Sequence, residues 1–216
     1  MTNHLWCVPH VHLAVVDEDI VVLDLEHDHY DCLVDAASWL EIGSDGRIHL
    51  QDQTAAKALV EAGIATDNPP TSPYTPRVRP NREVIIPSRP PRAETLRALL
   101  GLTAATAVFH RKSLLELVRF DLPRPGSTGR SQPLDSVIAA LLAAARQARP
   151  WVPFEGECLQ RSFQLRYYLA QRGITTEWVF GVRTWPFSAH CWLQVGDLII
   201  GDRLERVARY TPIMTA

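Results

Sequence analysis

Short apolar runs and polar clusters alternate along the first third of the chain. Over residues 11–33, three apolar runs are separated by the clusters DED and EHD, which suit tight turns. This pattern predicts a three-stranded antiparallel sheet. Apolar residues then recur at helical spacing over residues 33–40 and 52–62, and Gly63 is a typical helix stop. We therefore predict an N-terminal domain over residues 1–66 that combines this sheet with helices.

Proline marks the end of this domain. Eight of the chain's sixteen prolines lie within residues 67–91, and a segment with so few backbone donors is a poor core element. We predict a proline-rich linker over residues 67–91. Its apolar triplet, residues 84–86, indicates that part of the linker packs against a domain.

The remaining residues, 92–216, show helical spacing first and strand-like runs afterwards. Leucine and alanine recur at helical intervals over residues 92–120 and 133–149, and a further helix is expected from Cys158 to Gln171. The segments TEWVFGVR, AHCWLQV and LIIGD are rich in β-branched and aromatic residues, which favour strands. The pattern predicts an α+β protein whose C-terminal domain has helices followed by a small antiparallel sheet.

Composition and charge narrow the class of partner. The 216 residues carry 22 basic and 24 acidic side chains without long blocks of one sign, which gives no electrostatic footprint for nucleic acid or a membrane surface. The first residues lack a basic segment followed by a long apolar core, and no run of about 18 apolar residues occurs. We expect a cytoplasmic protein that binds neither nucleic acid nor membrane, and whose four cysteines are reduced thiols.

Cys158 is the candidate nucleophile. It follows Gly156 at the predicted start of a helix, where unpaired amides and the positive end of the helix dipole favour a thiolate. The charges of Glu155 and Glu157 would oppose this effect unless both side chains face solvent or are paired. Since a lone cysteine is more often inert, the assignment depends on its partners.

His190 and Asp202 are the candidate partners, on consecutive predicted strands. A two-residue loop at residues 196–197 would place Asp202 opposite Cys191 and separate the carboxylate from the imidazole. We predict instead a three-residue loop over residues 195–197, which places His190 across from Asp202. Asp202 then orients the ring while the other ring nitrogen takes the thiol proton. The alternative is that Asp202 only caps a strand end.

The sequence around these residues resembles a known family. The order of Cys158, His190 and Asp202 on a helix and two strands is similar to the transglutaminase-like, papain-like cysteine protease fold. The strings CLQRSFQLRYYLAQRGI and VFGVRTWPFSAHCWLQVGDLIIGD, with a terminal YTPI, closely resemble the lasso peptide biosynthesis B proteins. Cys191 is a departure, because relatives commonly carry alanine there, and we expect it to face the core.

This resemblance implies an activity and partners. In the family, this domain cuts the leader from a ribosomally made precursor peptide, and a separate asparagine-synthetase-like cyclase closes the macrolactam ring. The implied activity is therefore that of a cysteine peptidase with the triad Cys158, His190 and Asp202. The cysteine chemistry needs no metal and no cofactor. Relatives need ATP for full maturation, and because no phosphate-binding glycine loop is present, we assign any ATP to the cyclase.

Residues 1–66 resemble the winged-helix-like leader-recognition domain of the same pathways, which is similar to the small chaperone of pyrroloquinoline quinone biosynthesis. The resemblance rests on IVVLDLEHDHYDCL and LVEAGIA. A sheet with an open edge can add a peptide as a further strand, so we expect residues 29–33 to be that edge and the helix with Leu59 to wall the groove. The candidate substrate-binding residues are Tyr30, Cys32, Leu33 and Leu59, with Trp151 and Trp192 near the triad.

Other interpretations stay open. The alternating pairs His10 with His12 and His27 with His29 could hold a metal, but no further ligands accompany them, and solvated turn histidines are the simpler interpretation. Within the enzyme class, a thioester intermediate could pass to an amine, which would make the chain an acyltransferase. Alternatively, the chain is a non-catalytic chaperone that presents the precursor to the cyclase.

Overall fold

The computed structural model describes residues 5–43, 46–50, 52–69, 79–86, 90–123, 133–154 and 156–216. The chain has the α+β fold class that the sequence predicts. It divides into two compact units. Unit 1 comprises Met1–Arg77, Gly181–Ala189 and Tyr210–Met214, and unit 2 comprises Val78–Phe180, His190–Arg209 and Thr215–Ala216.

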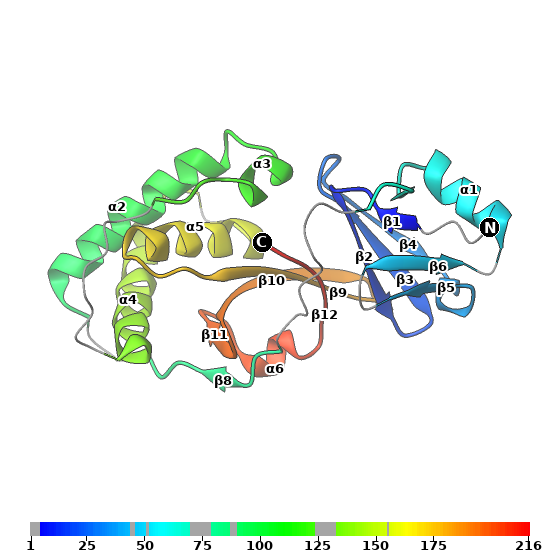
Figure 1. Ribbon diagram of the computed structural model, residues 1–216. Helices are drawn as coiled ribbons and strands as arrows, with labels where there is room; N and C mark the ends of the chain where they lie inside the picture. Colours follow the sequence, from blue (N-terminus) through cyan, green and yellow to red (C-terminus); the bar gives the residue numbers. More distant parts are fainter. Residues whose placement is uncertain are drawn as a thin grey trace. The chain divides into compact units, whose positions relative to one another are not determined.

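The three-stranded antiparallel sheet predicted near the N-terminus is confirmed in unit 1. Strands β2 (Val11–Val16), β3 (Asp19–Asp24) and β4 (His29–Leu33) pair in that order (Figure 1). Tight turns join them, with Asp17 and Asp28 at positive φ, a conformation that aspartate tolerates better than most residues. Among the described strands, β4 therefore ends the sheet.

Unit 1 also contains a second sheet that the sequence pattern did not predict. Its order is β5-β6-β1-β7, built from β5 (Leu40–Ile42), β6 (Arg47–Leu50), β1 (Leu5–Cys7) and β7 (Ala65–Thr66). The helix predicted over residues 33–40 is wrong, because only a 3-10 turn, Ala36–Ser38, forms there. Asp35 precedes this turn at a φ of 55° and donates its N–H to Asp19 Oδ1 at 3.0 Å, so the chain turns instead of entering an α-helix.

Helix α1 (Gln53–Glu61) confirms the second predicted helix of this region. The side chain of Asp52 caps it by accepting the Thr54 N–H at 3.0 Å, and Gly63 follows its end at positive φ. Leu59 on this helix is buried in the apolar core of unit 1.

Unit 2 contains the helices that the sequence predicts. They are α2 (Arg92–Phe109), α3 (Leu114–Val118), α4 (Leu134–Ala148) and α5 (Cys158–Gln171). Helix α2 packs against both α4 and α5, as Figure 1 shows. A buried polar contact fixes α2 to α5, because Glu94 accepts the Tyr168 hydroxyl at 2.7 Å and the Arg172 guanidinium at 2.9 Å. Helix α5, which begins at Cys158, is thus held from one side.

A five-stranded sheet has the order β12-β9-β10-β11-β8. Its members are β8 (Arg82–Glu83), β9 (Glu177–Arg183), β10 (Ser188–Val195), β11 (Leu198–Ile200) and β12 (Thr211–Thr215), and a short helix, α6 (Leu204–Val207), precedes β12. Strand β8 lies within the proline-rich segment and pairs in parallel with β11. Arg82 anchors it through hydrogen bonds to Asp197 and Asp135 at 3.0 Å, whereas Ile85 is 92% exposed. Part of this segment does pack, but through β8 and Arg82 rather than through Ile85.

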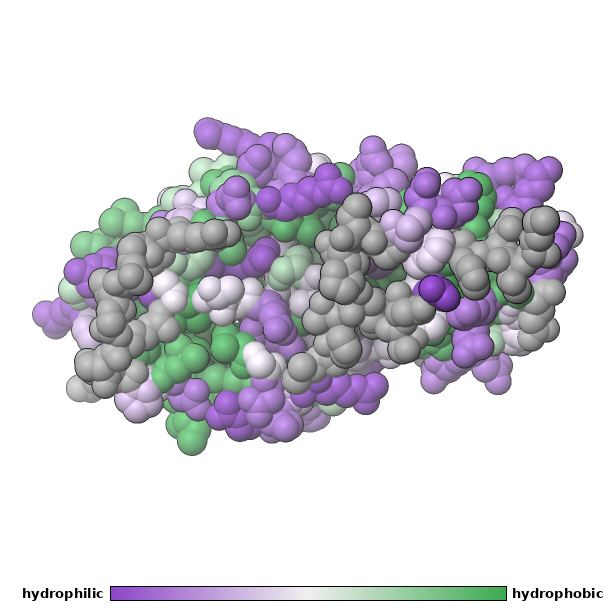
Figure 2. Space-filling model, in the orientation of Figure 1, coloured by the Kyte–Doolittle hydropathy of each residue, from purple (hydrophilic) through white to green (hydrophobic). Residues whose placement is uncertain are grey.

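The surface mixes hydrophilic and apolar side chains. Figure 2 shows hydrophilic residues over much of the visible face and apolar residues that reach it over α2, where Leu96 and Leu100 are exposed. Of the helices in the described ranges, none combines the length and the apolar character that crossing a membrane would require.

Candidate active site

Cys158 is the first residue of α5, as the sequence predicts. The chain enters this helix tightly, because the Gln160 side chain folds back and donates to the Phe154 carbonyl at 2.7 Å. A Cβ on Gly156 would lie 2.5 Å from the Cβ of Gln160, so this entry needs glycine. The first-turn amides of α5 and its positive dipole end are therefore close to the sulfur.

Glu155 and Glu157 are the two acidic neighbours of Cys158 whose charges would oppose a thiolate. Glu157 is exposed, which satisfies the condition that its charge must face solvent. Glu155 lies outside the described residues.

His190 and Asp202 are brought together, although not by the register that the sequence predicted. His190 Nε2 and Asp202 Oδ2 are 2.5 Å apart. The predicted three-residue loop is wrong, because Val195 pairs with Leu198 across a two-residue loop. In a continued ladder, this register would turn the carboxylate and the imidazole to opposite faces.

Gly201 resolves this conflict. Strand β11 ends at Ile200, and Gly201 has a φ of 74°, so Asp202 leaves the ladder and its side chain reaches the His190 ring. The N–H of Arg203 donates to Asp202 Oδ1 at 2.8 Å and fixes the carboxylate in this position. A Cβ on Gly201 would lie 2.7 Å from Leu165 Cδ2 on α5, so this bend also needs glycine.

Cys158 and His190 form a hydrogen-bonded pair with strongly shifted titration. Hydrogen bonds from the Cys191 thiol and from His190 lower the pKa of Cys158 to about 4, against burial, which would raise it. Burial alone would lower the pKa of His190, but its hydrogen bonds to Asp202 and Cys158 raise it to about 9. Between these two pKa values the pair is a thiolate and an imidazolium, the reactive form of a cysteine nucleophile.

Because Nε2 of His190 is bound to Asp202, Nδ1 is the ring nitrogen left for the sulfur. Burial would raise the pKa of Asp202, but the hydrogen bonds from His190 and from the Arg203 amide lower it below its usual value. The carboxylate therefore stays charged while the imidazolium exists.

Cys191 faces the core, as expected, and is 5% exposed. Its sulfur is also hydrogen-bonded to Cys158 and lies 3.3 Å from Ser162 Oγ on α5. Sequence reasoning missed the contact with Cys158. A sulfur at the position next to the candidate histidine was the one signal that pointed to it.

The other face of β10 is also organised as the strand alternation predicts. The Trp192 ring stacks on His190 with 6.2 Å between centroids. Trp192 Nε1 donates to Gln194 Oε1 at 3.2 Å, and Gln194 donates in turn to Glu177 at 2.9 Å. This chain of contacts fixes the indole against the imidazole and limits rotation of the His190 ring.

Cys158, His190 and Asp202 line one cavity of about 290 Å³ in unit 2. Trp192 lines it too, whereas Trp151 is not among its lining residues and is 77% exposed. Three arginines also line the cavity, namely Arg149, Arg161 and Arg206. Their positive charge favours a thiolate and an anionic reaction intermediate.

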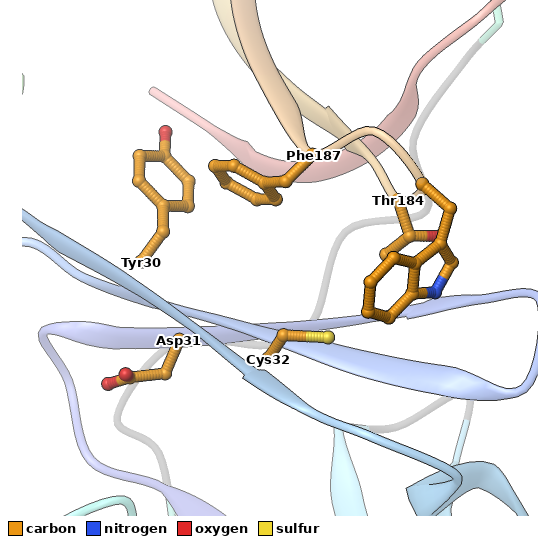
Figure 3. A pocket seen from close by; sticks show the side chains of 6 residues that line it. Tyr30, Asp31, Cys32, Thr184 and Phe187 are labelled. Carbon is orange, nitrogen blue, oxygen red and sulfur yellow. The ribbon is translucent and has the colours of Figure 1, made fainter.

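Unit 1 contains a separate pocket of about 110 Å³ at β4. Tyr30 and Cys32 line it together with Thr184, Trp185 and Phe187. Figure 3 shows the Tyr30 and Phe187 rings side by side, whereas Asp31 points away from Phe187. The two ring centroids are 5.6 Å apart and the ring planes are tilted by 56°.

The structure brings Tyr30 and Cys32 together in this pocket but not the other two predicted binding residues of unit 1. Leu33 packs against the core of unit 1, and Leu59 belongs to that core at 6% exposed. Leu59 is therefore positioned to support the sheet rather than to line the pocket.

Metal ligation finds no support among the described residues. No group of three or more His, Cys, Asp or Glu side chains within them is arranged to hold a metal ion. His27 and His29 instead bond to single carboxylates, those of Asp24 and Asp31.

Comparison with known proteins identifies the family of the C-terminal part of the chain. Residues 96–215, more than half of the 216, match the family described as the transglutaminase-like superfamily. A stretch of 49 residues is 43% identical to the microcin J25-processing protein McjB of Escherichia coli, and it covers 23% of this chain and 24% of that protein. No solved structure matches the chain at a significant level. The superfamily match spans α2 to β12 and includes all three candidate catalytic residues, so the chain belongs to the transglutaminase-like superfamily.

Proposed function

We propose that this chain is a leader peptidase of lasso peptide biosynthesis. It binds the leader of a ribosomal precursor peptide and hydrolyses the peptide bond at the junction of leader and core. The observation that carries the proposal is the placement of Cys158, His190 and Asp202 around one cavity, with His190 bonded to both of the others. The relative that processes microcin J25 supports the choice of substrate class.

The chemistry follows from the charge state of the pair. The Cys158 thiolate attacks the carbonyl carbon of the scissile bond, and the amide of Cys158 at the start of α5 is the natural donor to the oxyanion. His190 gives its proton to the leaving amine, which leaves the leader bound as a thioester. The neutral imidazole then takes a proton from water, and hydroxide releases the leader. Asp202 holds the ring in position and stabilises the imidazolium throughout.

Unit 1 is the proposed leader-binding part. Strand β4 ends its sheet among the described strands, so an extended leader can pair with this edge through backbone hydrogen bonds. The pocket lined by Tyr30, Cys32 and Phe187 would take an apolar side chain of the leader. The precursor is made by ribosomes and the proposed nucleophile is a free thiol, so we assign the reaction to the cytoplasm.

The cysteine chemistry itself uses no cofactor in this proposal. The partners are the precursor peptide and an asparagine-synthetase-like macrolactam cyclase, and any ATP requirement belongs to the cyclase. Transfer of the same thioester to an amine is the second candidate, because the superfamily name refers to acyl transfer.

Mass spectrometry of the cognate precursor tests the proposal. Wild type, Cys158→Ala and the control Cys7→Ala, which changes a cysteine of unit 1, are each incubated with the precursor, with and without the cyclase. We expect wild type and Cys7→Ala to release a free leader and Cys158→Ala to release none. A leader joined to an amine would instead establish acyl transfer. If the precursor binds wild type and Cys158→Ala equally and neither protein cuts it, the chain is a chaperone and not a peptidase.

A further inference from the structure

Cys158 has a second cysteine beside it, Cys191 on β10, which packs against the face of α5 that carries Cys158. Cys158 and Ser162 are four residues apart and therefore neighbours on the helix surface. The sulfur of Cys191 lies 3.3 Å from Ser162 Oγ, and both cysteines line the same cavity. The two sulfurs are also hydrogen-bonded to each other. Among the described residues, the site thus contains two adjacent thiols where the proposed mechanism uses one.

We propose that Cys191 is a resolving cysteine, which traps an oxidised Cys158 as an intramolecular Cys158–Cys191 disulfide and so protects the nucleophile from irreversible oxidation. The oxidant is a peroxide. In the first step the Cys158 thiolate attacks one oxygen of hydrogen peroxide, the O–O bond breaks, and the products are Cys158 sulfenic acid and hydroxide, which takes a proton from His190. In the second step the Cys191 sulfur attacks the sulfenic sulfur, the S–O bond breaks, and water leaves with the Cys191 proton.

The hydrogen bonds around Ser162 hold the Cys191 sulfur in place, whereas its proton is donated to Cys158. The Ser162 hydroxyl donates to the Leu159 carbonyl at 3.0 Å and accepts Trp178 Nε1–H at 2.8 Å. The single Cys191 proton is donated to the Cys158 thiolate, so the 3.3 Å approach of Ser162 Oγ positions the Cys191 sulfur without holding its proton. Cys191 is therefore a thiol at rest and does not compete with Cys158 as nucleophile.

Oxidation of Cys158 removes the main obstacle to Cys191 as a nucleophile. The hydrogen bond to Cys158 and burial raise the pKa of Cys191 while Cys158 is a thiolate. A sulfenic acid is neutral, so the charge that held the Cys191 proton disappears at the step where Cys191 must react. Oxidation also makes the Cys158 sulfur, which is adjacent to Cys191, electrophilic.

The remaining cysteines provide the background for a test. Cys7 and Cys32 belong to unit 1 and do not line the cavity of Cys158. Cys32 is exposed, and burial together with the Asp19 carboxylate raises its pKa, so it is a weaker target for peroxide. Replacing both by serine removes other routes to a disulfide.

The experiment treats the Cys7→Ser, Cys32→Ser double variant with hydrogen peroxide, then measures intact mass and maps cross-linked peptides. The same treatment is applied to this background carrying Cys191→Ala, and to this background carrying Cys191→Ser, which keeps a side chain of similar shape. Circular dichroism establishes that each variant is folded. The readout is the chemical state of the thiols, so the result is independent of the peptidase proposal.

We expect the double variant to lose a mass of two hydrogen atoms, to yield a peptide pair joined through Cys158 and Cys191, and to recover both thiols with a dithiol reductant. With Cys191→Ala or Cys191→Ser, Cys158 should gain two oxygens as a sulfinic acid, and reductant should restore almost none of it. Sulfinic acid at Cys158 with Cys191 still a free thiol in the double variant, formed as fast as in Cys191→Ala, would overturn the proposal.

Discussion

In the proposed mechanism, Asp202 acts on the reaction through the charge of the His190 ring. The carboxylate keeps its charge because it accepts from both His190 and the Arg203 amide, and its hydrogen bond raises the pKa of His190. The imidazolium in turn stabilises the Cys158 thiolate. The charge of each of these three residues affects the pKa of the next, so neutralising one residue changes the pKa values of the other two.

Asp202→Asn should therefore lower turnover of the precursor by on the order of 10²–10⁴-fold. Activity requires protonated His190 and ionised Cys158, so it rises with pH through about 4 and falls through about 9 in the wild type. Without the carboxylate the pKa of His190 falls, and the alkaline limb of the kcat/KM profile should move to lower pH. The profile is measured by precursor cleavage across this range.

Asp197→Asn is the matched control, because Asp197 is on the same hairpin but pairs with Arg82 outside the cavity. Its pH profile should follow that of the wild type. If Asp202→Asn keeps the wild-type alkaline limb as well, Asp202 is only a cap at the end of the strand.

The three candidate residues could be predicted from sequence because each follows a local rule. Cys158 follows a helix-start signal, and His190 lies on a recognisable strand. The bond between His190 and Asp202 could not be derived correctly, because a positive φ at one glycine decides it. The sequence LIIGD does not indicate that the strand ladder ends at Gly201.

At the level of elements, the bend after β11 brings the backbone of Gly201 against helix α5. Gly201 combines a φ of 74° with a neighbour, Leu165, that leaves no room for a side chain. Gly196 on the same hairpin has a φ of 59° and open space around it. Replacing Gly196 therefore tests backbone strain alone, whereas replacing Gly201 tests backbone strain and crowding together.

Gly196→Ala should cost about 1–2 kcal/mol of unfolding free energy from the left-handed backbone alone. Gly201→Ala should cost more, because Leu165 must shift, and it should also slow the reaction by moving Asp202 away from His190. Urea unfolding gives the first quantity and precursor cleavage the second. Equal losses of stability, with full activity in both variants, would show that the bend does not position Asp202.

Element prediction succeeded for the long helices and missed several of the shortest strands. The spacing of leucine and alanine identified α2 and α4 because each offers several turns of repeated pattern. Strands β1, β5 and β7 have three residues or fewer, too short to show an alternation, and they form only because unit 1 supplies partners for them. The apolar triplet in the proline-rich segment did mark a region that packs, although the contacts come from β8.

At the scale of the whole molecule, the proposal joins a binding unit to a cutting unit. A leader held by unit 1 is presented to Cys158 at a raised effective concentration, without any added contact at the cut. The chain itself also links the two sites, since Phe187 of the unit 1 pocket and His190 lie three residues apart. Substitutions in the unit 1 pocket should therefore change precursor binding, and substitutions around Cys158 should change the rate of cleavage.

Tyr30→Ser removes one aromatic wall of the pocket at β4 and should raise KM for the precursor about tenfold, which corresponds to about 1.4 kcal/mol, while kcat stays unchanged. Val15→Ser is the control, because it removes a partly exposed apolar side chain from β2, at the other end of the same sheet. Steady-state cleavage kinetics measure both constants. A Tyr30→Ser enzyme with the KM of Val15→Ser would place leader binding elsewhere.

The reactivity of Cys158 toward iodoacetamide as a function of pH is the most direct test of the central claim, because it needs no substrate. With Cys158, His190 and Asp202 arranged as described, alkylation of Cys158 should follow an inflection near pH 4 and remain fast at neutral pH. An inflection near 8.5, the value of an ordinary thiol, would mean that Cys158 is not an ion-paired nucleophile and would contradict the account.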